Sequence, residues 1–180
     1  MSSYRIVFCG PVGAGKTTAI TALSDTPPIL TEVQSDEARR AGKSTTTVAF
    51  DHGRVALPSG DQLLLYGTPG QARFDFMWPI VSENAVGAIV LANNESAQTI
   101  NQTLEYVRRF APRMPGGNCI VGVGRSERAP LPSVADYTDA LQQAGYHLPV
   151  MNVDVRQRAH CVLLLNVLLS RLDAQRKLAG

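Results

Sequence analysis

A run of glycines, a lysine and two threonines near the start of the sequence has the types and spacing to hold phosphate. The run is Gly10-Pro11-Val12-Gly13-Ala14-Gly15-Lys16-Thr17, with Thr18 directly after it. It follows the pattern G-x-x-x-x-G-K-[ST], in which glycines let successive backbone N–H groups point inward around an anion. Lys16 can then reach terminal phosphates, and the Thr17 hydroxyl can bind Mg²⁺. The run therefore predicts a nucleotide phosphate site that uses Mg²⁺.

Such a loop works only between a strand and the N-terminus of a helix, and the flanking segments fit that arrangement. Short β-branched runs alternate with longer helical patterns along the whole chain, which predicts an α/β fold with a mostly parallel sheet. We expect strands at residues 5–9, 46–50, 54–57, 62–66, 85–91, 119–123 and 150–153, with one more edge strand within 29–33. We expect helices at residues 16–23, 96–110, 134–144 and 157–176.

Length and composition indicate one ordinary domain. The chain has 180 residues, of which 44% are hydrophobic and 18% charged, enough to bury one core. We expect a single domain over residues 1–180. The formal net charge of +2 is too balanced for nucleic acid or an anionic membrane to be the expected partner.

The cysteines and the apolar stretches predict a protein of a reducing compartment. Cys9, Cys119 and Cys161 lie far apart, a spacing that favours buried thiols over a zinc site or a disulfide. No apolar stretch is long enough to cross a bilayer. We therefore expect a soluble, cytoplasmic chain without direct membrane insertion, recruited to a membrane or cell pole only through partners.

Two further segments carry a family resemblance. Thr47-Val48-Ala49-Phe50-Asp51 follows a long polar loop, and Gly67-Thr68-Pro69-Gly70-Gln71 follows the strand at 62–66. With the phosphate loop, these segments resemble the Ras-like small GTPases, and most of all the bacterial branch of MglA-type gliding-motility GTPases encoded beside roadblock-fold proteins. The resemblance implies a P-loop NTPase three-layer sandwich: about six strands, the second antiparallel to the rest, with helices on both faces.

The resemblance also assigns roles to single residues. It implies that Thr47 meets Mg²⁺ and the γ-phosphate only in the triphosphate state, and that the Gly70 N–H senses the γ-phosphate. Gln71 matches the glutamine that orients the attacking water. Catalysis would then involve Gln71, Lys16 and Thr47, and the metal would be held by Thr17 and Thr47. A β-forming threonine run and a polar helix residue are the alternatives for Thr47 and Gln71.

The sequence departs from the family pattern at the metal. The family's second switch usually opens with an aspartate that holds Mg²⁺ through water, and here that position is Gly67. We expect weaker metal binding unless another carboxylate substitutes. Asp51, on the preceding strand, is a candidate, with a purely structural role as the alternative.

A second departure concerns the base. Where the family has Asn-Lys-x-Asp to read guanine, this sequence has Gly124-Arg125-Ser126-Glu127. The resemblance implies that Glu127 accepts from guanine, Arg125 covers the base plane, and Val155 offers its N–H to the guanine carbonyl. A solvated loop with incidental charge is the alternative.

These expectations combine into a GTP-binding switch that hydrolyses GTP slowly in bacterial polarity, motility or signalling, with GTP/GDP and Mg²⁺ as ligands. No arginine directly precedes Thr47 in the sequence. Because an arginine finger is worth about 10³–10⁵ in rate, its absence there predicts slow intrinsic hydrolysis. A roadblock/LC7-type regulator or GAP, and an effector at the switch regions, are the partners that the resemblance implies. Two alternatives stay open: a nucleotide-binding scaffold with negligible hydrolysis, and a P-loop kinase for a small metabolite.

Overall fold

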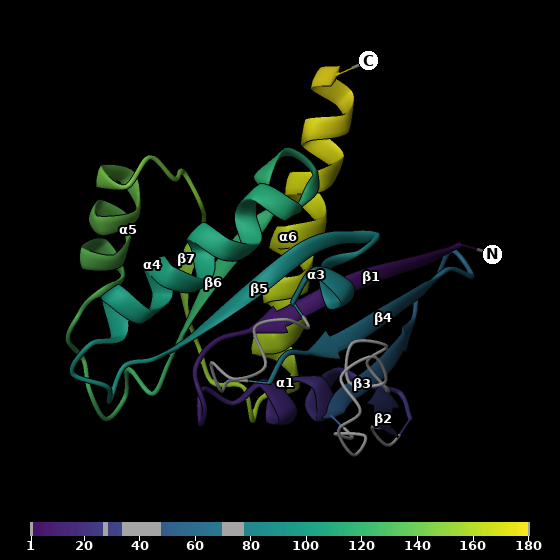
Figure 1. Cartoon of the computed structure of the whole chain (residues 1–180), viewed down its shortest axis with the longest axis horizontal. Coiled ribbons are helices and arrows are strands. Elements are labelled where there is room, and N and C mark those ends of the chain that lie inside the picture. Colours follow the sequence, from purple (N-terminus) through teal and green to yellow (C-terminus); the bar gives the residue numbers. More distant parts are fainter. Residues whose placement is uncertain (1, 27–28, 34–47, 70–77, 180) are drawn as a thin grey trace, which may run out of the picture.

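A single twisted sheet forms the middle layer of the protein (Figure 1). The computed structural model describes residues 2–26, 29–33, 48–69 and 78–179. Within these ranges the sheet has seven strands in the order β2-β3-β4-β1-β5-β6-β7. The strands are β1 (Ser3–Cys9), β2 (Ile29–Val33), β3 (Val48–Ala56), β4 (Gln62–Gly67), β5 (Ala85–Asn93), β6 (Cys119–Gly124) and β7 (Val150–Val153).

One strand runs against the others. β3 pairs antiparallel with both β2 and β4, whereas the pairs β4–β1, β1–β5, β5–β6 and β6–β7 are all parallel. A tight turn joins β3 to β4, closed by the Gly60 N–H donating to the Leu57 carbonyl at 2.9 Å. The parallel strands are instead joined through helices, as crossover connections require.

Helices cover both faces of the sheet. They are α1 (Lys16–Leu23), α3 (Trp78–Ser82), α4 (Thr99–Phe110), α5 (Val134–Gln143) and α6 (Arg158–Ala179). Side chains alternate along the strands: Ile6 and Phe8 of β1 pack toward α1 and α6, whereas Val7 and Cys9 pack toward α3, α4 and α5. β5 and β6 divide in the same way, so the sheet is buried on both sides.

The α/β fold and the positions of its elements agree with the sequence prediction. The helix at Lys16–Leu23 and the strand at Val150–Val153 have the expected bounds, and the edge strand at Ile29–Val33 is present. That edge strand brings the described sheet to seven strands where about six were expected, and it makes the antiparallel strand third in the chain instead of second. The three cysteines are buried free thiols, and burial raises the pKa of Cys119 to about 12.

The carboxyl ends of the parallel strands all lie at one edge of the sheet. There, residues 10–15 follow β1, Thr68 and Pro69 follow β4, Arg125 follows β6 and Asp154 follows β7. Ligands of open α/β sheets bind outside this edge. Across the described ranges, none of the helices has the length and apolarity needed to span a membrane.

Candidate functional site

The loop between β1 and α1 has a backbone that only glycine permits at two points. Gly10 has a φ of +139°, and a Cβ there would lie 2.2 Å from the Leu91 carbonyl oxygen of β5. Gly15 has a φ of +93°, and its Cβ would lie 2.7 Å from a methyl carbon of Val155. Gly15 is also the N-cap of α1 and supplies no side-chain cap, so the first-turn N–H groups of α1 are free to bind an anion.

Lys16 folds over this loop. Its side chain is only 9% exposed, and its Nζ donates to the Gly10 and Pro11 carbonyl oxygens at 2.8 Å each. An ammonium group has three N–H donors, so one remains for a phosphate oxygen. Burial lowers the pKa of Lys16 from its ordinary value of 10.5, because desolvation penalises the charged form.

Asp51 reaches the same end of α1 from β3. The Thr17 hydroxyl donates to Asp51 Oδ2, and Asp51 lies opposite Gly67 in the β3–β4 ladder. A Cβ at Gly67 would lie 3.1 Å from Asp51 Cβ and 3.3 Å from Asp51 Oδ2. The glycine therefore leaves the room that the Asp51 carboxylate occupies beside Thr17.

A pocket of about 190 Å³ continues from the phosphate loop toward the ends of β6 and β7. Six of the residues predicted to bind nucleotide line it: Ala14, Gly15, Thr18, Arg125, Glu127 and Val155. Among the described residues, no acceptor receives a hydrogen bond from the backbone N–H of Val155. The pocket thus brings a carboxylate and a spare amide donor to one place beside the phosphate loop.

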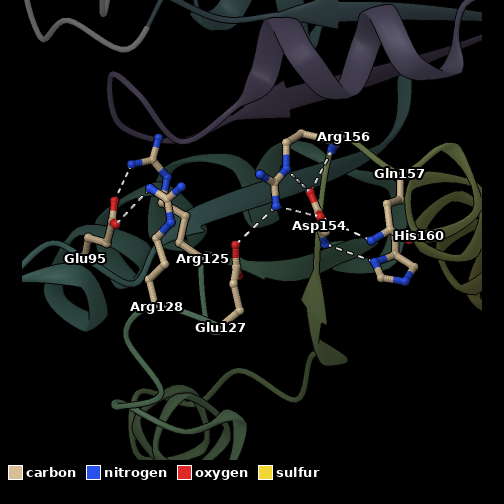
Figure 2. Close-up of polar contacts among 8 residues, drawn as sticks. All are labelled: Glu95, Arg125, Glu127, Arg128, Asp154, Arg156, Gln157 and His160. Atoms are coloured by element: carbon tan, nitrogen blue, oxygen red, sulfur yellow. Dashed lines mark hydrogen bonds and ion pairs between the residues drawn. The ribbon is translucent and has the colours of Figure 1, made fainter.

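Arg125 ties the phosphate loop to the wall of this pocket. Its guanidinium donates to the Gly13 carbonyl oxygen at 2.9 Å and pairs with Glu95, which follows β5 (Figure 2). Arg128 lies 3.7 Å from the other Glu95 oxygen. The Arg125 and Arg128 contacts lower the pKa of the Glu95 carboxyl. Glu95 therefore stays ionised and holds Arg125, which joins the phosphate loop to the loop after β6.

The other side of the pocket holds a chain of alternating charges (Figure 2). Arg156 lies 3.3 Å from Glu127 through its Nη2. The same arginine contacts both oxygens of Asp154, at 2.7 and 2.8 Å. These contacts hold the pKa of the Asp154 carboxyl well below its usual range.

A buried amide supports the loop that carries Arg125 and Glu127. Asn94 is 3% exposed, and its Nδ2 donates to the carbonyl oxygens of Ala129 at 2.6 Å and Pro132 at 3.0 Å. Its Oδ1 accepts from the Tyr137 hydroxyl at 2.8 Å. Because every polar atom of this side chain is used, the pocket wall is anchored to β5 and α5.

The structure brings six of the residues singled out in the sequence into one pocket: Ala14, Gly15, Thr18, Arg125, Glu127 and Val155. Lys16 and Thr17 lie between two of these lining residues in the chain, at the start of α1. Thr47, Gly70 and Gln71 lie outside the described residues. Five contributors received no role from the sequence: Asn94, Glu95, Arg128, Asp154 and Arg156. Asn94 and Glu95 carried a usable signal, because polar residues directly after a buried parallel strand lie at the ligand-binding edge.

Comparison with known proteins identifies the fold. No protein-family model matches the chain, and no curated protein matches it. Its structure is similar to the crystal structure of a bacterial selenocysteine-specific elongation factor, EF-Sec, with a TM-score of 0.67 and 17% sequence identity. The match covers 95% of this chain and 29% of that chain, so this chain spans less than a third of that protein's length. The two chains therefore share a fold over this match.

Proposed function

We propose that the protein is a GTP-binding switch that hydrolyses GTP slowly. The observation that carries this proposal is a single pocket that Ala14 and Gly15 of the phosphate loop line together with Glu127 and Val155. Phosphates would bind the first-turn amides of α1 and the third donor of Lys16. The similarity of fold to a GTPase supports the same assignment.

Guanine is the base that this pocket suits best. Its ring N–H and amino group are donors for the Glu127 carboxylate, and its carbonyl oxygen can accept from the Val155 N–H. Adenine presents an amino group where guanine has that carbonyl, so two donors would meet and the Val155 amide would lose its partner. The positions of Glu127 and Val155 on opposite loops of one pocket support guanine.

The residues beside the phosphate loop fit Mg²⁺. The Thr17 hydroxyl and the Asp51 carboxylate lie in contact, and both are the oxygen ligands that Mg²⁺ prefers. We propose that Thr17 and Thr47 hold the ion and that Asp51 replaces the family's aspartate. Bound Mg²⁺ would neutralise charge on the phosphates.

In the proposed reaction a water attacks the γ-phosphorus in line, the bond from that phosphorus to the oxygen bridging to the β-phosphate breaks, and GDP and inorganic phosphate are released. Gln71 positions that water by accepting from it and donating to a phosphate oxygen, and the phosphate accepts the first proton. Lys16 stabilises the charge that develops on the transferred group. Without an arginine finger beside Thr47, turnover on its own is slow and a partner would set the lifetime of the triphosphate state.

A competition experiment tests the nucleotide assignment. Purified protein is titrated with GDP, GTP, ADP and ATP, with and without Mg²⁺. We expect both guanine nucleotides to bind more tightly than the adenine nucleotides, and Mg²⁺ to tighten binding. Preference for adenine would overturn the base assignment, and no nucleotide uptake by folded protein would overturn the whole proposal.

Single-turnover hydrolysis tests the enzymatic part. We expect Gln71→Ala to slow hydrolysis about tenfold or more, while Gln143→Ala, at the exposed end of α5, leaves the rate unchanged. Equal background rates in the wild type and Gln71→Ala would show a nucleotide-binding scaffold instead.

The cellular role is proposed on the MglA-type resemblance of the loop and switch motifs. We place the protein in bacterial polarity, motility or signalling, with a roadblock/LC7-type regulator. Co-elution of the GTP-analogue complex, but not the GDP complex, with such a protein during gel filtration would support it. The proposal would be contradicted if the protein eluted alone, without the partner, in both the GTP-analogue and the GDP complex.

A further inference from the structure

The Glu127 carboxylate can discriminate between bases only if it is held in place. This carboxylate stands on an exposed loop, with the side chain 51% exposed, and a glutamate has one more rotatable bond than an aspartate. A side chain that must be ordered when the ligand binds loses entropy and weakens the complex. Some other group must therefore hold this carboxylate if it is to discriminate between bases.

Arg156 is the group in contact with it. The Arg156 guanidinium is itself fixed, since Nε and Nη2 each donate to one oxygen of Asp154, at 2.7 and 2.8 Å. Asp154 is fixed in turn, because the backbone N–H of Arg156 donates to Oδ1 at 3.0 Å and the Gln157 amide donates to Oδ2 at 3.2 Å. Nη2 also donates to Glu127 Oε1, at 3.3 Å (Figure 2).

The arginine also cancels a repulsion. Glu127 and Asp154 both line the pocket, and two carboxylates on one small pocket push each other apart unless a cation lies between them. Arg156 occupies that place and contacts both. A carboxylate offers about four acceptor positions, so one contact to Oε1 leaves positions on both oxygens for a ligand.

We propose that Arg156, held by Asp154, is a positioning residue that fixes the Glu127 carboxylate and thereby sets selectivity for a purine that carries the 2-amino group. The inference rests on the proposed guanine-nucleotide function. It assigns to Arg156 no contact with the reacting phosphates, only control of the carboxylate that meets the base.

The test compares GDP with inosine diphosphate, which lacks only the 2-amino group. Dissociation constants for both are measured with the wild type, Arg156→Ala, Arg156→Lys and Glu127→Ala. We expect the wild type to prefer GDP, and Arg156→Ala to reduce that preference about fivefold, the value of one exposed charged contact. Arg156→Lys keeps the charge but loses the two-point contact with Asp154, so its preference should be intermediate.

Two controls separate positioning from general effects. Arg108→Ala removes an exposed arginine from the last turn of α4 and should leave the preference unchanged. In the Glu127→Ala background, adding Arg156→Ala should have no further effect on the preference, because the group to be positioned is gone. Circular dichroism melting shows that each variant is folded.

The outcomes are distinguishable. If Arg156→Ala weakens GDP and inosine diphosphate equally, or if the wild type binds both equally, the inference is overturned while the proposed function stands. If the folded wild type takes up neither, both the inference and the proposed function are overturned.

Discussion

Asp51 and Gly67 lie opposite each other across the antiparallel β3–β4 ladder, at the point where a metal-holding aspartate is expected on β4. The two positions share one space, since a Cβ at Gly67 would lie 3.1 Å from that of Asp51 and 3.0 Å from an Ile20 methyl carbon. A side chain at position 67 would therefore crowd the Asp51 carboxylate beside Thr17. Asp51 on β3 can thus supply the carboxylate that β4 lacks at Gly67.

This arrangement predicts that Asp51 controls the response to Mg²⁺. Asp51→Asn keeps the shape but removes the charge, and we expect the Mg²⁺ concentration needed to tighten GDP binding to rise about tenfold, as for other groups that orient a metal. The measurement is a GDP dissociation rate at graded Mg²⁺. Asp139→Asn, on the exposed side of α5, is the matched control, and identical Mg²⁺ curves for both variants would rule the role out.

Lys16 predicts proton uptake on nucleotide binding. Burial lowers the pKa of Lys16 from 10.5, so above the lowered pKa a fraction of the ligand-free folded molecules has lost this proton. Between the lowered pKa and 10.5 the unfolded chain holds more protons than the folded one, so the free energy of unfolding rises with pH in that range. Bound phosphates favour the ammonium form and raise the pKa again. Calorimetry of GDP binding at alkaline pH, in buffers of different ionisation enthalpy, should reveal the uptake. Buffer-independent heats there would contradict it.

At this scale, spacing along the sequence was sufficient for some residues and not for others. The place of the loop 10–15 between β1 and α1 could be predicted because its residues are neighbours in the chain, and Glu127 was singled out because it matches a family pattern. The ion pairs of Arg156 with Glu127 and of Arg125 with Glu95 join residues 29 and 30 positions apart. Which arginine meets which carboxylate depends on the sheet order, which periodicity does not reveal.

Helix α1 is held at both ends by groups outside it. Its N-terminus faces the phosphate loop, and at its C-terminus Arg158, from the start of α6, donates to the Ala22 and Leu23 carbonyl oxygens at 2.9 and 2.7 Å. Arg158 also reaches Asp25 at 3.2 Å. A cation that satisfies the last carbonyls of a helix also interacts favourably with its dipole.

We expect Arg158→Ala to lower the free energy of unfolding by about 1 kcal/mol, with a melting temperature about 2–4 °C lower. Two carbonyl oxygens of α1 would lose their partner. Thermal denaturation followed by circular dichroism is the measurement. Arg108→Ala removes an equal charge from α4 and should melt like the wild type, so equal melting of both variants would show that the cap contributes nothing.

Element type could be read from the sequence, but one boundary could not. The sequence predicts two short strand runs interrupted at Asp51-His52-Gly53, because aspartate and glycine are rare in strands. The structure continues β3 through all three, since Asp51 and His52 pair with Gly67 and Tyr66. Gly53 is needed where α1 crosses, because a Cβ there would lie 2.8 Å from an Ile20 methyl carbon. Tertiary contact outweighs strand propensity at this point.

On the scale of the whole molecule, Trp78 joins α3 to α4 within the core. It begins α3, is 5% exposed, and packs on Tyr106 and Phe110 of α4 with ring centroids 5.6 and 5.3 Å apart. The Arg109 guanidinium lies over the same indole, 4.7 Å from its centroid. Trp78 is therefore part of the buried cluster that packs against this face of the sheet.

Trp78 is the single tryptophan, so its fluorescence reports on this junction. We expect the emission intensity to differ between complexes with GDP and with a non-hydrolysable GTP analogue, because a shift of α3 changes the contacts of the indole with Tyr106 and Arg109. Trp78→Phe should abolish the signal. Superimposable spectra at saturating nucleotide would mean that α3 stays in place during the proposed switch.

The charges around the proposed nucleotide pocket have a consequence for how fast a nucleotide would bind. Three arginines and three carboxylates meet there, paired with one another: Arg125, Arg128 and Arg156 with Glu95, Glu127 and Asp154 (Figure 2). Their fields cancel at a distance, so an approaching polyanion is neither drawn in nor repelled until it reaches the amides of the loop itself. Encounter should therefore proceed by unassisted diffusion, at a rate that changes little with ionic strength.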